Sequence, residues 1–227
     1  MPTPSLTRQC LSELLGTYLL VSLGPGSVIA TSALGIAPLE SLLIIATAFG
    51  CAVGGIIILL GRFSGAHINP AISVASATAG VFKRNLLLPY VLFQLTGAIL
   101  AGLSLRIVFG NLGASTSLGS TTLAAGVPPI EGIALEVAGT FVLAISALTA
   151  SSRFTSPIRQ GALVGGTLFI LILFIGPLTG ASFNPARSMG PSLFSGYFAN
   201  QFIYYVGPPI GGLIAGLAFA RRGKTHA

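Results

Sequence analysis

The sequence predicts an all-α integral membrane protein with six membrane-spanning helices and two re-entrant half-helices. Each half-helix belongs to a segment that enters the membrane and leaves it on the same side. Three observations support this fold class: a very apolar composition, six apolar segments of spanning length, and a ten-residue motif that occurs twice. Of the 227 residues, 53% are hydrophobic and only 7% are charged, and the mean hydropathy is +0.92. A soluble domain carries about 25% charged residues, so the composition excludes an ordinary soluble protein.

The six apolar segments each approach the roughly 20 residues that a helix needs to cross a bilayer. The first is also too long for the hydrophobic part of a signal peptide, so it is expected to be a true span. The predicted spans are Leu11–Ala33, Leu39–Leu60, Leu87–Phe109, Ile133–Ala150, Gly161–Ile175 and Phe202–Ala220.

The repeated motif lies outside these spans. It reads Ser-Gly-Ala-His-Ile-Asn-Pro-Ala-Ile-Ser from Ser64, and Thr-Gly-Ala-Ser-Phe-Asn-Pro-Ala-Arg-Ser from Thr179. Asparagine can cap a helix, and proline suits the first helical position. Each motif therefore predicts a helix of roughly ten residues, about 15 Å long, which is half the apolar thickness. Irregular backbone at this depth must be buried in protein or line a water-filled cavity. The helix-starting residues are Asn69, Pro70 and Ala71 in one copy and Asn184, Pro185 and Ala186 in the other.

The duplication extends beyond the motif. Glu13-x-x-Gly16-Thr17 in the first span matches Glu136-x-x-Gly139-Thr140 in the fourth. We expect one domain over residues 1–227, with internal repeats at about 8–109 and 131–220. Because each repeat holds an odd number of spans, the second copy must enter the membrane from the opposite side, as in an inverted repeat.

Basic residues predict the orientation. Six spans bring both termini to one side, and nine of the 11 Lys and Arg residues fall there. That excess predicts cytoplasmic termini of a multi-pass protein in the plasma membrane. The net charge of +7 is scattered over the ends of apolar segments, so no nucleic-acid partner is expected. The nine residues are Arg8, Arg62, Lys83, Arg84, Arg153, Arg159, Arg221, Arg222 and Lys224.

The two motifs also predict a chemistry. Half-helices that enter from opposite faces bring their N-termini together near the midplane, and each N-terminus carries roughly half a positive charge. The amides of Asn69 and Asn184 would donate hydrogen bonds there, whereas backbone carbonyls of the preceding turns would accept them. Such a pore passes small neutral molecules and rejects ions and protons. The carbonyls expected to line it belong to Gly65, Ala66, His67, Gly180 and Ser182.

Together these motifs resemble the major intrinsic protein family, the aquaporins and aquaglyceroporins, over essentially the whole chain. The resemblance rests on both Asn-Pro-Ala boxes, on Arg187 after the second box, on both Glu-x-x-Gly-Thr segments, and on the Tyr90, Gln94 and Gly97 pattern. It implies the aquaporin fold, which is a right-handed bundle of six helices and two half-helices. It also implies a homotetramer with one pore per subunit.

Arg187 could simply extend its side chain to the lipid headgroups, or its guanidinium could face the pore and repel cations. The resemblance implies the second interpretation and assigns Arg187 to an outer constriction. The other members of this selectivity filter, identified by their spacing from the boxes, are Phe49, Ile172 and Ala181.

This filter departs from the common family patterns. Water-selective members usually have His where this chain has Ile172, and glycerol channels usually have Gly there and an aromatic residue at the position of Ala181. Isoleucine at this position is typical of archaeal aquaporins. Ser188 and the Tyr204-Tyr205 pair instead favour water over glycerol. We expect a water channel that also passes some glycerol or small neutral gases. The alternative is a broad, glycerol-type facilitator of small neutral solutes.

Three further residues have more than one interpretation. Glu13 and Glu136 lie within spans, where they could form a proton relay or could hold the re-entrant loops by accepting backbone N–H groups. The second interpretation is favoured, because the chain has no other intramembrane acid to continue a relay. His67 could brace its loop or could face the pore and sense pH. Cys51 should face away from the lumen if Phe49 faces it, so little inhibition by mercury is expected.

Two other functional classes compete with a passive channel. A coupled transporter can also use inverted repeats and broken helices, but it would need ionisable residues at the midplane. A junctional membrane protein would be expected to carry a long or adhesive external loop. We expect no enzyme, cofactor or metal site, because no nucleophile–base pair or metal-binding constellation is apparent. The expected partners are water, small neutral solutes and the lipid bilayer.

Overall fold

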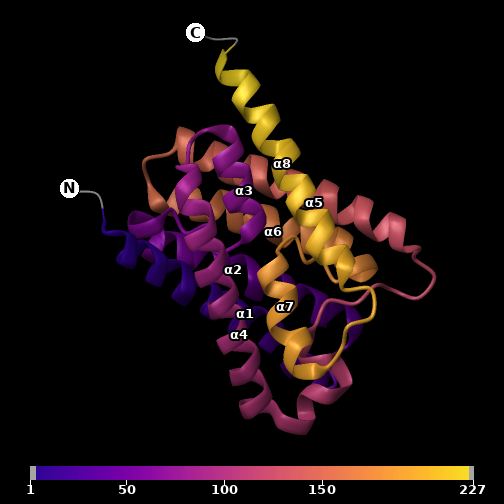
Figure 1. Ribbon diagram of the computed structural model, residues 1–227. Coiled ribbons are helices and arrows are strands. Elements are labelled where there is room, and N and C mark those ends of the chain that lie inside the picture. Colours follow the sequence, from indigo (N-terminus) through magenta and orange to yellow (C-terminus); the bar gives the residue numbers. More distant parts are fainter. Residues whose placement is uncertain (1–3, 225–227) are drawn as a thin grey trace.

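The structure is a computed structural model that describes residues 4–224 (Figure 1). Residues 1–3 and 225–227, which belong to the predicted domain, lie outside the described residues, as do the side chains of Arg222 and Lys224. The helices are α1 (Leu6–Ala33), α2 (Pro38–Ser64), α3 (Pro70–Ala79), η1 (Arg84–Leu86), α4 (Leu87–Phe109), η2 (Gly110–Gly119), α5 (Pro129–Arg153), α6 (Pro157–Thr179), α7 (Pro185–Ser195) and α8 (Phe202–Lys224).

The predicted fold class is confirmed. Helices α1, α2, α4, α5, α6 and α8 are long and apolar enough to cross a membrane, and no strand occurs among residues 4–224. The six predicted spans all fall within these helices, which extend further at most of their ends. The chain is therefore a multi-pass membrane protein.

The two halves of the chain make equivalent contacts. Helix α1 packs on α4, α5 packs on α8, and α2 packs on α6 between the halves. A β-carbon at Gly97 of α4 would clash with the carbonyl oxygen of Leu14, and one at Gly211 of α8 would clash with that of Val137. Glycine thus allows the same close helix crossing in both halves, as small residues do in membrane interiors.

The two half-helices pack across the halves. Helix α3 lies against α8, and α7 lies against α4. Figure 1 shows α3 in the upper part of the bundle and α7 in the lower part. Each ends at a glycine in the left-handed conformation, Gly80 with φ 78° and Gly196 with φ 72°, which closes the last turn. Their N-termini lie close together in the middle of the bundle, where the residue before each helix donates a hydrogen bond to the backbone before the other helix.

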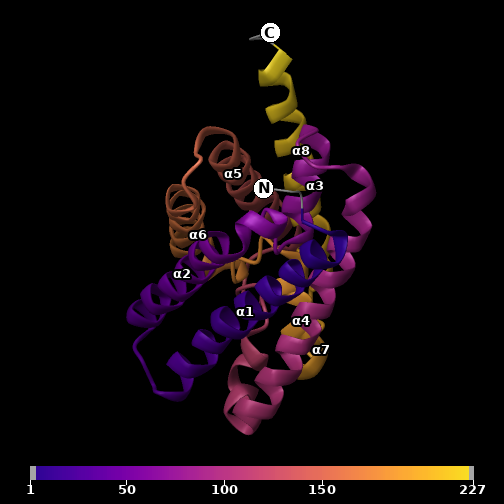
Figure 2. The same ribbon diagram turned by 90° about the vertical axis from the view of Figure 1, so that its left-hand side faces the viewer.

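The ends of the bundle differ in their connections. Figure 2 shows the start of α1 and the end of α8 toward the same, upper end, whereas the α1–α2 connection and η2 lie at the lower end. After η2, the chain returns inward before α5 begins. There the N–H of Ala124 donates a hydrogen bond of 2.9 Å to the carbonyl of Leu178 at the end of α6.

Candidate functional site

The two asparagines link the half-helices directly. Oδ1 of Asn69 accepts the N–H of Ala71 at 2.8 Å, and Oδ1 of Asn184 accepts the N–H of Ala186 at 3.0 Å. Each carbonyl side of the amide therefore caps its own helix. Each Nδ2 donates to the opposite loop, Asn69 to the carbonyl of Phe183 at 2.8 Å and Asn184 to that of Ile68 at 3.0 Å. One N–H of each amide group is left for another acceptor.

Glu13 holds the first re-entrant loop from the side. Its Oε1 accepts the Ser64 hydroxyl at 2.7 Å and the N–H of His67 at 2.9 Å. Its Oε2 accepts the N–H of Ile68 at 2.6 Å and Nε2 of Gln94 at 2.7 Å. The carboxylate is fully buried, and these donors stabilise its charge there.

Glu136 makes the equivalent contacts in the second half. Its Oε1 accepts the Thr179 hydroxyl at 2.7 Å and the N–H of Ser182 at 3.0 Å, and its Oε2 accepts the N–H of Phe183 at 2.7 Å. The chain has Pro208 at the position that corresponds to Gln94, so this carboxylate receives one donor fewer. The two loops are therefore held by similar but unequal hydrogen-bond sets.

These hydrogen bonds hold an unusual backbone. In the first loop, Ala66 and Ile68 have φ of 48° and 46°, and in the second, Ala181 and Phe183 have φ of 45° and 53°. Residues other than glycine rarely adopt such left-handed values. The carbonyls of Ile68 and Phe183 are used by the asparagines. Among the described residues, no hydrogen-bond donor reaches the carbonyls of the five residues predicted to line the pore.

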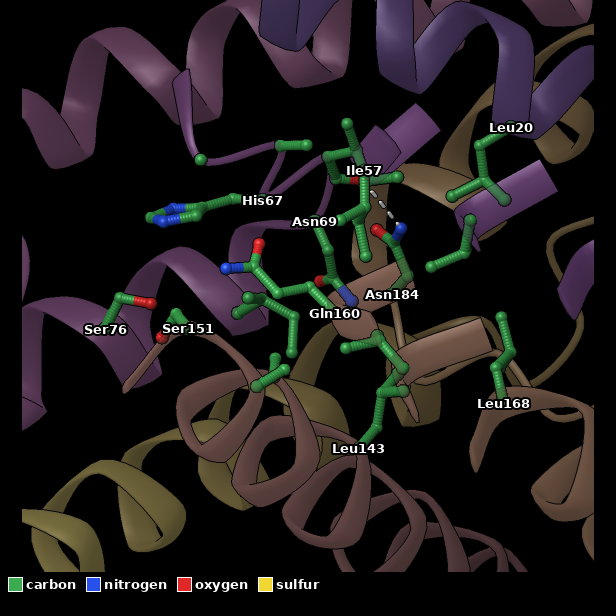
Figure 3. Close-up of a pocket in the computed structure, with 18 of the residues that line it drawn as sticks. Leu20, Ile57, His67, Asn69, Ser76, Leu143, Ser151, Gln160, Leu168 and Asn184 are labelled. Atoms are coloured by element: carbon green, nitrogen blue, oxygen red, sulfur yellow. Dashed lines mark hydrogen bonds between the residues drawn. The ribbon is translucent and has the colours of Figure 1, made fainter. Parts of the chain in front are cut away.

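A cavity of about 410 Å³ runs past both asparagines (Figure 3). In Figure 3, Asn69 and Asn184 lie side by side at its middle, with Leu143 across from them. The loop carbonyls and amides form one wall, and the rest of the wall is mostly apolar. The apolar lining includes Leu20, Val53, Ile57, Ile72, Leu143, Val164 and Leu168.

One end of the cavity is formed by Phe49, Ala181 and Arg187, which are 3–4% exposed. The guanidinium carbon of Arg187 lies 4.9 Å from the centre of the Phe49 ring, and its Nη1 donates to the carbonyl of Gly119 at 2.8 Å. Its Nε is buried without a partner among the described residues. Arg187 is thus held inside the protein and does not extend to the headgroups. Ile172 is also buried in α6, but it is not among the described residues that line this cavity.

The other end of the cavity is more polar. It is lined by His67, Ser76, Ser151 and Gln160, which are labelled in Figure 3. His67 is engaged by its surroundings, because its Nδ1 lies 3.1 Å from the Ser73 hydroxyl and its ring packs edge-on against Phe82. These contacts are those of a loop-bracing histidine that also touches the cavity.

Some contacts at the site could not be foreseen from the sequence. Gly119 lies in a segment rich in Ser, Thr and Gly that carries none of the repeated motifs, yet its carbonyl orients Arg187. The nearby Thr121 hydroxyl lies 2.9 Å from that of Ser188, which itself contacts Ser182. No local pattern signals these pairings. Cys51 lies where the sequence predicts, exposed on an outward groove of α2 and α6 and away from the cavity.

Comparisons with known proteins agree with this geometry. The sequence pattern of the family described as "Major intrinsic protein" matches residues 1–219. Aquaporin NIP1-1 from Zea mays is 36% identical over 215 residues, which cover 93% of this chain and 73% of that protein. Aquaporin AqpM from Methanothermobacter marburgensis is 33% identical over 239 residues, covering 95% of this chain and 97% of that protein.

A solved structure agrees on the fold. The aquaglyceroporin from Plasmodium falciparum superimposes with a TM-score of 0.83 at 21% identity, covering 96% of this chain and 95% of that one. The crossed asparagines, the matched family pattern and the relatives that match over most of this chain agree with one another. The protein therefore belongs to the major intrinsic protein family, whose members are membrane channels and not enzymes.

Proposed function

We propose that the protein is a passive channel for water that excludes ions and protons and also passes some glycerol or small neutral gases. The observation that carries this proposal is the pair of crossed asparagines at the middle of a continuous cavity. Each amide there has one N–H free for a passing molecule, and the wall across from them is apolar. A neutral molecule can exchange hydrogen bonds along one wall, whereas an ion would lose its hydration without replacement.

Ion exclusion follows from the charges at the site. The N-termini of α3 and α7 meet at Asn69 and Asn184, and their partial positive charges repel cations. A water molecule that gives its lone pairs to both amides cannot accept a proton from its neighbour at that point, which interrupts proton transfer along the chain of water. We assign Asn69, Pro70, Ala71, Asn184, Pro185 and Ala186 to this central element.

We assign Phe49, Ile172, Ala181 and Arg187 to the outer selectivity filter. Phe49 and Arg187 supply an apolar face and a fixed cation at one end of the cavity. Ala181 contributes little volume, and Ile172 contributes no polar group, so the filter excludes large polyols less strictly than a polar one would. The loop carbonyls of Gly65, Ala66, His67, Gly180 and Ser182 serve as acceptors, and Glu13 and Glu136 hold the loops.

The alternative function is a broad facilitator of glycerol and related neutral solutes. The small side chain of Ala181 and the apolar side chain of Ile172 in the filter favour it, whereas Ser188 and the Tyr204-Tyr205 pair favour water. The aquaglyceroporin from Plasmodium falciparum is 21% identical to this chain, so the likeness between the two concerns the fold.

Stopped-flow light scattering on proteoliposomes of the purified chain separates the two. Fast shrinkage in sucrose followed by slow re-swelling in glycerol is expected for the water channel. Re-swelling in glycerol as fast as the shrinkage would instead support the broad facilitator. An Arg187→Val variant tests the role of the filter. Its filter is wider and uncharged, so the glycerol rate should rise relative to the water rate.

We also propose the wider setting of this channel. It forms one domain over residues 1–227, with repeats at about 8–109 and 131–220, and it lies in the plasma membrane with both termini cytoplasmic. It assembles as a homotetramer with one pore per subunit. The excess of basic residues at one end of the bundle supports this orientation, and cross-linking in native membranes tests the tetramer.

A further inference from the structure

Residues 119–124, called here the inward segment, lie between α1 and the second re-entrant loop. A β-carbon at Gly119 would lie 2.6 Å from the carbonyl oxygen of Pro25 in α1, which is closer than real β-carbons approach. A β-carbon at Gly180, in the loop, would lie 3.2 Å from Cα of Thr121. The inward segment therefore makes close backbone contact with both the helix and the loop, which glycine permits.

This contact places the Gly119 carbonyl beside Arg187. The carbonyl accepts Nη1 of Arg187 at 2.8 Å, and this is the one hydrogen bond that the guanidinium makes among the described residues. The Nε of the same group is buried without a partner there. The position of the filter cation thus depends on one backbone oxygen, and that oxygen is held only as firmly as the inward segment is.

A glutamine at the start of α8 anchors the inward segment. Nε2 of Gln201 donates to the Thr121 carbonyl at 2.8 Å, two residues after Gly119. The backbone of Gln201 is itself fixed, because its carbonyl accepts the N–H of Tyr204 at 3.0 Å in the first turn of α8. Gln201 is 3% exposed, so bulk water does not compete for this hydrogen bond, which a low local dielectric strengthens.

The other polar contacts of the inward segment are less direct. The hydroxyls of Ser120 and Thr121 meet serines of α7, but a side chain can rotate without moving its backbone. The N–H of Ala124 donates to a carbonyl at the end of α6, but it lies five residues beyond Gly119. Apart from the bond to Arg187, the contact from Gln201 is therefore the one that holds the backbone closest to the Gly119 carbonyl.

We propose that Gln201 is a positioning residue of the outer filter. By holding the Thr121 carbonyl, it keeps the Gly119 carbonyl where that oxygen orients Arg187, and it thereby sets how strictly the filter rejects polyols. A guanidinium that leaves its position widens this end of the cavity, which matters more for glycerol than for the smaller water molecule. Gln201 is not among the described residues that line the cavity, so it acts through Arg187. This inference rests on the proposed channel function.

The test measures the ratio of glycerol to water permeability by stopped-flow light scattering on proteoliposomes of the full chain. Gln201→Leu keeps a side chain of similar size but removes the donor. It should raise the ratio about fivefold, which corresponds to the loss of one ordinary hydrogen bond. A variant that folds poorly lowers both rates together, so the ratio reports the filter.

The matched control is Gln9→Leu. Nε2 of Gln9 also donates to a backbone carbonyl at 2.8 Å, but Gln9 lies near the start of α1, at the other end of the bundle. Its ratio should equal that of the unmodified protein. An unchanged ratio in Gln201→Leu, or an equal rise in Gln9→Leu, would overturn the proposal.

A double variant separates positioning from a general structural role. In an Arg187→Val background, Gln201→Leu should leave the ratio unchanged, because no guanidinium remains to be positioned. Two residues that act through the same contact show this kind of non-additivity. A further rise of the ratio in that background would show that Gln201 acts by another route and would refute its role through Arg187.

Hydrogen exchange distinguishes this inference from the channel function itself. Loss of the anchor should let the inward segment open more often, so mass spectrometry should detect faster amide exchange there in Gln201→Leu and no change in Gln9→Leu. If exchange rises but the unmodified protein conducts no water, the anchor stands, and the specificity role falls with the channel function. If water is conducted but neither the exchange nor the ratio changes, the channel function stands and the role of Gln201 is refuted.

Discussion

Each of the two central asparagines uses its amide twice. The oxygen of Asn69 or Asn184 caps its own half-helix, and the nitrogen binds the backbone just before the other asparagine. The remaining N–H of each amide is therefore fixed in direction by the other hydrogen bonds of that amide, two at Asn69 and three at Asn184, which do not involve the permeating molecule. Donors that are already oriented need no reorganisation when a solute passes. The position of the site thus depends on single side chains with several partners.

A residue-scale prediction concerns Gly24 of α1, which belongs to none of the motifs found in the sequence. A β-carbon at Gly24 would overlap the ring of Phe49, and Arg187 lies near that ring. Gly24→Ala should therefore push the ring into the cavity and lower water permeability severalfold in stopped-flow measurements. Gly26→Ala, whose β-carbon would be 3.6 Å from the nearest atom, is the control. Unchanged permeability in Gly24→Ala would contradict the position of Phe49.

A second prediction uses the positions of the cysteines. Cys51 faces outward from the bundle, whereas Ala181 lines the cavity. Mercury should leave the water permeability of the unmodified protein unchanged. The Ala181→Cys variant should be inhibited by mercury, and an added thiol compound that binds mercury should reverse this inhibition. The variant is made with and without Cys51→Ser. Strong inhibition of the unmodified protein would show that Cys51 or Cys10 reaches the permeation path.

At the scale of the elements, the two re-entrant loops differ in how firmly they are held. Each oxygen of the Glu13 carboxylate has two donors, whereas Oε2 of Glu136 has only the N–H of Phe183. A glutamine has one accepting oxygen. Glu13→Gln must therefore leave two hydrogen-bond donors without an acceptor. Glu136→Gln leaves only one such donor, if the amide oxygen takes the place of Oε1.

This difference predicts unequal costs in stability. Each lost charge-assisted hydrogen bond costs about 1.5–3 kcal/mol, so Glu13→Gln should lower the free energy of unfolding by about 3–6 kcal/mol, and Glu136→Gln by half of that. Reversible unfolding in mixed micelles measures both. Glu40→Gln, at an exposed position in the first turn of α2, should have little effect. A larger cost at position 136 than at 13 would refute the hydrogen-bond count.

Some elements of the fold could be predicted from the sequence and others could not. The half-helices could be predicted because Asn-Pro-Ala carries its own cap and first turn, and α3 and α7 begin at Pro70 and Pro185. The inward path of the chain after η2 could not be predicted, because the contact of Gly119 with Arg187 joins residues 68 positions apart. The left-handed conformations of Ala66 and Ile68 could not be predicted either, because the groups that hold this backbone include Glu13 and Asn184, which are distant in the sequence.

The whole molecule shows why duplication produces a pore. Two inverted halves place α3 against α8 and α7 against α4, so each half-helix is supported by the last helix of the other half. The cavity lies between the halves, and neither half encloses it alone. The duplicated Glu-x-x-Gly segments made this arrangement predictable, whereas the burial of Ile172 beside the cavity depends on side-chain packing that periodicity does not reveal.

The orientation of the molecule gives a further prediction. In a background without Cys10 and Cys51, single cysteines are placed at Leu34 in the α1–α2 connection and at Thr155 in the α5–α6 connection, both exposed. A membrane-impermeant maleimide added to intact cells should label Leu34→Cys only, and Thr155→Cys should react only after lysis. The opposite labelling would reverse the proposed topology.

The central claim is that one cavity, with paired amides at its midpoint, conducts neutral molecules and blocks charge. The most direct test measures osmotic water permeability and proton leak on the same proteoliposomes. We predict shrinkage much faster than that of empty liposomes, with a proton leak equal to theirs. A proton leak that rises with the amount of protein, or shrinkage no faster than that of empty liposomes, would contradict the account.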